Sequence, residues 1–175
     1  MSNFLRQHIT NTVNYDFLNK FVYRDVSKLP VLLEVHLQFQ LRSFDSQLLI
    51  MALAALEIIT HNKCSITKTK TSNVTLKFRK GSPIGCKVAL RKFKALTFII
   101  MLIDTFSLEN KDCKLGIGPK GFCLEQHVSK VLNIPGLEGN YHFFRQLGNL
   151  RIKFLTTSKT KNELRYLLRS YKLKN

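Results

Sequence analysis

A chain of 175 residues suits a single domain, and a 45% hydrophobic content supports a buried core, which excludes a disordered basic tail. Lysine and arginine number 28 against 11 acidic residues, giving a formal net charge of +17. A field of this strength attracts polyanions and repels basic partners. Nucleic acid is therefore the first class of partner to consider, and an anionic membrane surface is the second.

The N-terminal part of the chain predicts a helix, a strand and a second helix. Residues 3–22 carry apolar side chains at loosely helical intervals. After Pro30, apolar and polar residues alternate from Val31 to Leu41, which is typical of a strand with one buried face. Asp45 fits a helix cap, and residues 48–59 are apolar nearly all round, so we expect a buried helix.

The middle of the chain predicts a basic pair of strands. Residues 64–71 are β-branched and polar, which indicates an exposed strand or loop. Alternation at residues 74–79 and again at 86–91, with a turn-like composition at 81–85 between them, predicts a strand–turn–strand pair. Lysine and arginine would then occupy the outer face of both strands.

The C-terminal half adds helices and short strands. Apolar spacing from Phe93 predicts an amphipathic helix that ends near Ser107, and 114–117 and 121–124 suit short strands. Alternation at residues 150–155 predicts a last strand, and Thr160 with Glu163 forms a capping box before a closing helix.

This mixture predicts an α+β fold, in which an antiparallel β-sheet has α-helices packed on one face. We expect one domain over residues 1–175, with 1–16 as a candidate N-terminal extension. The four cysteines form no C-x-x-C pair and the histidines complete no zinc spacing, so we expect free thiols and no metal or other cofactor. The apolar run 95–103 is too short to cross a bilayer as a helix, and no signal peptide is visible, so no membrane insertion is expected.

Positive charge is concentrated in the middle of the chain. No acidic residue lies between Glu57 and Asp104. Cations along an exposed surface suit phosphates, because each contact releases counterions, and small hydroxyls suit sugar and phosphate oxygens. The candidate RNA-binding residues are Lys63, Lys68, Lys70, Thr71, Ser72, Lys77, Arg79, Lys80, Lys87, Arg91 and Lys92.

The same stretch carries a family resemblance. The run TKTKTSNVTLKFRKGSPIGCKVALR, residues 67–91, resembles the central signature of the large-subunit ribosomal protein L-five family. There a Lys-rich loop precedes Phe-Lys-Leu-Arg, an acidic residue, Gly-x-Pro-Ile-Gly and Lys-Val-Thr-Leu-Arg. The residues that match in register are Gly81, Pro83, Ile84, Gly85, Lys87, Val88, Leu90 and Arg91.

Further pieces of the chain match in the same order. Residues 21–30 are similar to the family's Phe-x-Tyr and Val-Pro segment, 115–117 to its Leu-Gly-Ile, and 145–168 to its closing strand, Thr-Thr pair and helix. The similarity covers roughly residues 17–170 and is that of a divergent, organellar form.

The resemblance implies a structural constituent of the large ribosomal subunit rather than an enzyme. Family members lie in the central protuberance and bind large-subunit rRNA, usually with 5S rRNA. Their Lys-rich loop approaches the elbow of the P-site tRNA, and another surface meets a protein of the small-subunit head. Other proteins of the protuberance are neighbours. Residues 37–40 replace the family's Asn-Met-Gly, a segment associated with 5S rRNA contact. Either 5S rRNA is bound differently here, or it is absent from this ribosome.

Two alternatives stand beside this interpretation. One is an RNA-processing or RNA-modifying enzyme with an unrecognised site, and the other is a peripheral membrane protein that uses its basic face. Most aromatic residues fall on expected core faces, with Phe143-Phe144 as the exception to test for base stacking. Composition rich in Lys, Asn, Ile and Phe favours a mitochondrial ribosome, with an organelle-encoded chain; a plastid or a bacterial cytoplasm is the alternative.

Overall fold

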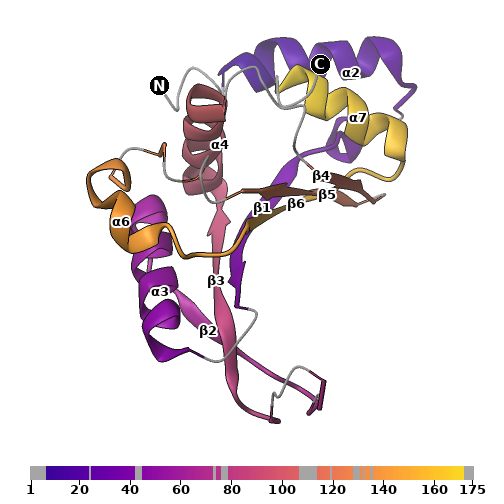
Figure 1. Ribbon diagram of the computed structural model, residues 1–175. Helices are drawn as coiled ribbons and strands as arrows, with labels where there is room; N and C mark the ends of the chain where they lie inside the picture. Colours follow the sequence, from indigo (N-terminus) through magenta and orange to yellow (C-terminus); the bar gives the residue numbers. More distant parts are fainter. Residues whose placement is uncertain are drawn as a thin grey trace. The chain divides into compact units, whose positions relative to one another are not determined.

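A computed structural model describes residues 7–23, 25–41, 45–72, 74–75, 79–106, 114–118, 120–127, 131, 133–134 and 136–171. Its strands form one six-stranded sheet in the order β2-β3-β1-β6-β5-β4 (Figure 1). The strands are β1 (Leu32–Gln40), β2 (Ser65–Lys68), β3 (Pro83–Arg91), β4 (Lys114–Ile117), β5 (Gly121–Gln126) and β6 (Leu150–Thr156). The helices are η1 (Ile9–Val13), α2 (Asn14–Lys20), η2 (Val26–Lys28), α3 (Ser46–Thr60), α4 (Lys92–Phe106), η4 (Glu138–Asn140), α6 (Tyr141–Phe144) and α7 (Lys161–Ser170).

Burial alternates along the long strands. In β6, Leu150, Ile152, Phe154 and Thr156 are buried, whereas Arg151 and Lys153 are exposed. The inner positions of β1 are likewise buried at Val35, Leu37 and Phe39. A sheet with one dry and one wet face is covered by helices on one side only. The expected α+β class, an antiparallel sheet with helices on one face, is confirmed.

The chain divides into two compact units. Unit 1 comprises Met1–Val35, Leu90–Cys123 and Lys153–Asn175, and unit 2 comprises His36–Ala89 and Leu124–Ile152. Several strands contribute residues to both units, so each unit is described by itself below.

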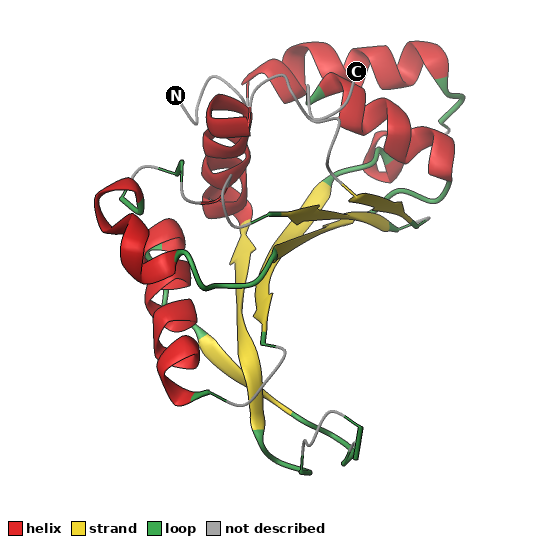
Figure 2. Ribbon diagram, in the orientation of Figure 1, coloured by secondary structure: helices red, strands yellow, loops and turns green. Residues whose placement is uncertain are grey.

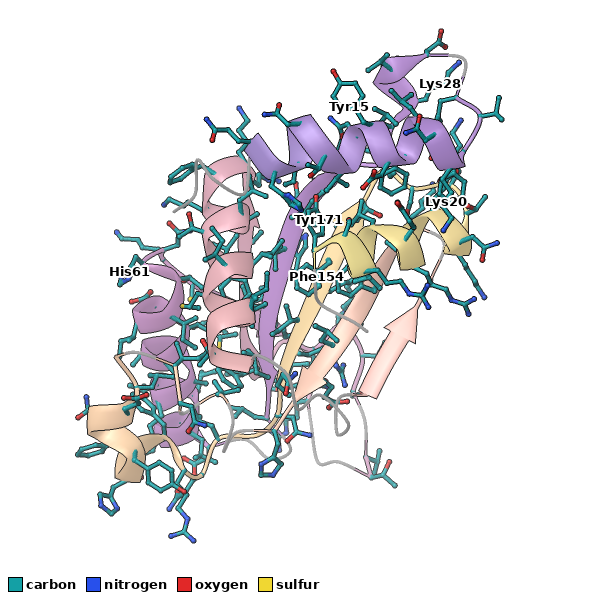
Figure 3. All side chains as sticks on the ribbon, turned by 90° about the horizontal axis from the view of Figure 1, so that it is seen from above. Tyr15, Lys20, Lys28, His61, Phe154 and Tyr171 are labelled. Carbon is teal, nitrogen blue, oxygen red and sulfur yellow. The ribbon has the colours of Figure 1, made fainter. Side chains whose placement is uncertain are left out.

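In unit 1 the N-terminal helices pack on the closing helix. Val13 and Phe17 form a buried cluster with Leu29, Leu167 and Tyr171, and α2 lies beside α7 (Figure 3). The Phe17 ring meets Tyr166 edge-on at 5.0 Å between centroids, and Lys20 Nζ lies 4.3 Å from the Tyr166 ring centre. Aromatic and cation–π contacts of this kind add specificity to plain burial.

The start of α7 confirms the predicted capping box. The Thr160 hydroxyl accepts the Glu163 backbone N–H, and the Glu163 carboxylate accepts the backbone N–H groups of Thr160 and Lys159. Burial of Tyr23 raises the pKa of its hydroxyl to about 12, and the negative charge of Glu163 adds to the shift. Glu163 therefore fixes the start of α7 through backbone hydrogen bonds.

Unit 2 contains α3 and the hairpin of β2 and β3. Asp45 caps α3 as predicted, accepting the Gln47 N–H at 2.9 Å. The expectation that this helix is buried all round is wrong, because Ile50 is 65% exposed while Leu56 is fully buried. In unit 1, Phe93 is also 58% exposed, so the apolar face of α4 begins at Ala95. Apolar character alone does not decide which side of a helix finds a neighbour.

The pairing of the basic strands differs from the prediction. β3 pairs with β2, placing Ser65 opposite Lys87 and Thr67 opposite Gly85. Val74 and Thr75 lie in a turn, and residues 76–78 are outside the described residues. The predicted turn at 81–85 is shifted, because Ser82 N–H bonds the Arg79 carbonyl and β3 begins at Pro83. The strand–turn–strand pair is therefore built from the earlier of the two candidate segments.

Candidate nucleic-acid interface

The hairpin of β2 and β3 carries most of the predicted RNA-binding residues. Figure 2 shows the two strands side by side. All the described members of the predicted set that belong to unit 2 are exposed to solvent: Lys63, Lys68, Lys70, Thr71, Ser72, Arg79, Lys80 and Lys87. Lys77 is outside the described residues.

Hydroxyl groups fix the end of this hairpin. Thr69 N–H donates to the Ser82 carbonyl at 2.9 Å, and Gly81 N–H donates to the Thr69 carbonyl at 3.0 Å. The hydroxyls of Thr69 and Ser82 both donate to the carbonyl of Arg79. Gly81 has a φ of +87°, which glycine adopts without strain. The backbone therefore turns sharply between Arg79 and Ser82.

The turn brings four cations to one end of unit 2. Lys68 lies opposite Pro83, and Lys70 follows Thr69, the residue bonded to Gly81 and Ser82. Arg79 and Lys80 come from the turn itself. We call these four residues, Lys68, Lys70, Arg79 and Lys80, the hairpin tip. Sequence periodicity did not predict the part played by Ser82, because a serine in a turn carries no periodic signal.

No acidic side chain in the surrounding sequence offsets this charge. The nearest preceding acid is Glu57, near the end of α3, and its carboxylate accepts the Cys64 backbone N–H at 3.1 Å. Four exposed cations in a stretch of sequence without acids repel one another unless an anion lies between them. The hairpin tip therefore has the electrostatics of a phosphate-binding surface.

The predicted RNA-binding residues of unit 1, Arg91 and Lys92, do not belong to the hairpin tip. Arg91 Nε lies 2.7 Å from Glu34 Oε1, so a carboxylate already neutralises this guanidinium. Lys92 is exposed at the start of α4, with a φ of +50°. The structure thus brings the four residues of the hairpin tip together, whereas Arg91 is engaged in its own ion pair.

The described residues contain no group suited to hold a metal. Burial raises the pKa of the Cys64 thiol to about 11, and the charge of Glu57 adds to the shift. Burial raises the pKa of the Cys86 thiol to about 12. The charge of Cys64 raises this pKa further, whereas a hydrogen bond with the Phe39 backbone lowers it. Both thiols stay protonated at neutral pH, which disfavours thiolate chemistry. Among the described ranges there is no cluster of three potential metal ligands, and no helix there is long and apolar enough to span a membrane.

Comparison with known proteins tests the resemblance over nearly the whole chain. No family model matches. The large ribosomal subunit protein uL5 of Nitrosomonas eutropha is 30% identical over 174 residues, which cover 96% of each chain. The protein of the same name from Heliobacterium modesticaldum is 32% identical over 171 residues, 94% of this chain and 93% of its own.

A relative named uL5m is similar to nearly the same degree. Large ribosomal subunit protein uL5m of Reclinomonas americana is 29% identical over 177 residues, which cover 98% of this chain and 97% of the relative. These comparisons confirm the resemblance seen in residues 67–91 and extend it over almost the whole chain. Because this similarity covers more than nine-tenths of both chains, the chain belongs to the uL5 family of large ribosomal subunit proteins.

Proposed function

We propose that this protein, a structural constituent of the large ribosomal subunit and not an enzyme, binds ribosomal RNA with its β2–β3 hairpin. The observation that carries the proposal is the hairpin tip, where four exposed cations stand in a stretch without acidic residues. Phosphate contacts of this kind give affinity and orientation without reading sequence. Lys63, Thr71, Ser72 and Lys87 are further exposed candidates on unit 2, and Arg91 and Lys92 are separate candidates on unit 1.

Within the ribosome, we place the protein in the central protuberance. The support is the position of the Lys-rich segment in the family signature, where it corresponds to the loop that approaches the P-site tRNA. The same correspondence makes 5S rRNA, a protein of the small-subunit head and the neighbouring proteins of the protuberance candidate partners. We also propose that residues 1–175 form a single family domain, with 1–16 as a candidate N-terminal extension.

The proposed setting is a mitochondrial ribosome. Its support is the composition of the chain together with the similarity to the uL5m relative, which nearly equals the similarity to the bacterial relatives. A plastid or bacterial ribosome is the alternative. Fractionation of the source cells, with the protein followed by antibody through organelle and ribosome preparations, separates these settings.

The salt dependence of RNA binding tests the hairpin. Each lysine that neutralises a phosphate contributes about 0.7 to 0.9 to the slope of log affinity against log salt. Replacing Lys68 and Lys70 with alanine should therefore lower that slope by about 1.4 to 1.8 for large-subunit rRNA. Filter binding or fluorescence anisotropy over a salt series measures the slope.

A charge-matched control makes the result specific. Lys159 and Lys161 are exposed at the start of α7 and lie outside the predicted set, so their double alanine variant removes the same net charge. We expect it to keep the wild-type slope. An unchanged slope in the hairpin variant, or an equal fall in the control, would show that the hairpin tip is not the interface.

A further inference from the structure

A second surface of unit 2 exposes aromatic rings. Phe143 is 63% exposed and Tyr141 is 42% exposed, although both belong to the short helix α6. Arg145 follows, with its backbone N–H bonded to the Tyr141 carbonyl at 3.1 Å. We call Tyr141, Phe143 and Arg145 the aromatic platform. Because Tyr141 and Arg145 are four residues apart on a helical turn, they share a side, and Phe143 projects from another.

The platform is firmly attached to unit 2. Phe144 and Leu147 are each only 6% exposed, and Leu137, just before η4, is 1% exposed. The helix α6 contacts α3, and a Cβ on Gly136 would lie 3.1 Å from Ile58 Cγ2. Leu137, Phe144 and Leu147 therefore anchor this segment, while Tyr141 and Phe143 are exposed to solvent. Of the pair Phe143-Phe144, only the first is available to a ligand.

The chemistry around the rings favours RNA over other ligands. Between Glu138 and Glu163 the chain has no acidic residue, and exposed amides flank the platform at Asn140, Gln146 and Asn149. Unpaired bases stack on aromatic rings and on guanidinium planes, and amides bond base edges. A four-residue helix is too short for the amphipathic surface that a membrane requires.

We propose that the aromatic platform binds unpaired nucleotides of ribosomal RNA by stacking their bases on Tyr141 and Phe143. This inference rests on the proposed function, but it names a different surface and a different kind of contact. The hairpin tip holds phosphates through charge and is salt-sensitive. Stacking depends on ring faces and changes little with salt.

The test uses the full chain and an adenosine octamer of RNA with 2-aminopurine at its centre. Stacking quenches 2-aminopurine fluorescence, and titration gives the affinity. Replacing Phe143 with alanine should weaken binding by roughly five-fold or more and reduce the quenching, with the salt slope unchanged. Phe143→Tyr should restore both, whereas Phe143→Leu, which keeps an apolar side chain without a ring, should not.

Tyr15 supplies the matched control, because it is an aromatic residue with the same 63% exposure on unit 1. Tyr15→Ala should leave affinity and quenching unchanged, and circular dichroism should show every variant folded. Wild-type binding by Phe143→Ala would overturn the proposal while leaving the hairpin function intact. The decrease of the salt slope in the Lys68 and Lys70 variant, by contrast, tests only the hairpin.

A second arm identifies the partner in the assembled ribosome. Phe143 is replaced by benzoylphenylalanine, and large subunits that contain the variant are irradiated. Crosslinks to unpaired rRNA nucleotides would support the platform. Crosslinks to protein alone would overturn the proposal in favour of a protein interface.

Discussion

Gly85 lies at a point in the sheet where the neighbouring strand leaves no room for a side chain. It lies in β3 against β1, where an added Cβ would stand 2.2 Å from the carbonyl oxygen of Phe39 and 3.3 Å from the Cα of Gln40. Ordinary carbon–oxygen contacts between strands lie at about 3.3 Å or more. Alanine at this position therefore forces the two backbones apart by roughly 1 Å, because no flexible side chain can yield instead.

The cost follows from the hydrogen bonds nearby. Leu41 N–H donates to the Ile84 carbonyl at 2.9 Å, and a 1 Å separation would take this bond beyond bonding distance. Losing a hydrogen bond so that a buried polar group is left without a partner costs about 1 to 3 kcal/mol. Displacing packed strands costs a similar amount. Since Phe39 is 1% exposed, β1 has little room to relax. We expect Gly85→Ala to lower the free energy of unfolding by about 2 to 4 kcal/mol.

Urea unfolding followed by circular dichroism measures this loss. Gly139→Ala is the control, because a Cβ there meets nothing within 4 Å. Glycine-to-alanine changes at open positions are neutral or stabilising by about 0.4 to 1 kcal/mol. The free energy of unfolding should therefore fall in Gly85→Ala and stay unchanged or rise in Gly139→Ala. If Gly85→Ala stayed within about 0.5 kcal/mol of the wild type, the close approach of β1 and β3 would be refuted.

Two further predictions concern single side chains. Thr160→Ala removes the hydroxyl that accepts the Glu163 N–H, and should cost about 1 kcal/mol in urea unfolding, whereas a cost near zero would mean that the cap does not stabilise α7. Glu57→Gln removes a negative charge that helps raise the pKa of Cys64 to about 11. The lower pKa gives more thiolate, so iodoacetamide should alkylate the Cys64 peptide faster at about pH 8.5, as mass spectrometry can follow. An unchanged rate would show that burial alone holds the thiol protonated.

Much of the local structure could be predicted from the sequence. The alternation from Val31 to Leu41 predicts β1, and Thr160 with Glu163 predicts the start of α7; the structure confirms both. The short strands β4 and β5 were also expected, from residues 114–117 and 121–124. These features depend on neighbours within a few residues, which is the range over which side-chain periodicity and capping act.

The partner of β3 could not be predicted in the same way. Both residues 64–71 and 74–79 have the composition of a strand, and only backbone hydrogen bonds between distant segments choose β2. For the same reason, the sequence predicts Gly85 to be a turn residue, whereas in the structure it lies in β3 and leaves room for the backbone carbonyl of Phe39.

The sequence by itself determined the family, the alternating strands and the concentration of positive charge between Glu57 and Asp104. Only the tertiary structure decided which cations share a surface: the hydroxyls of Thr69 and Ser82 turn the hairpin tip, while Glu34 neutralises Arg91. The physical reason is that charge is a property of each residue, whereas the availability of a charge depends on what the fold places beside it.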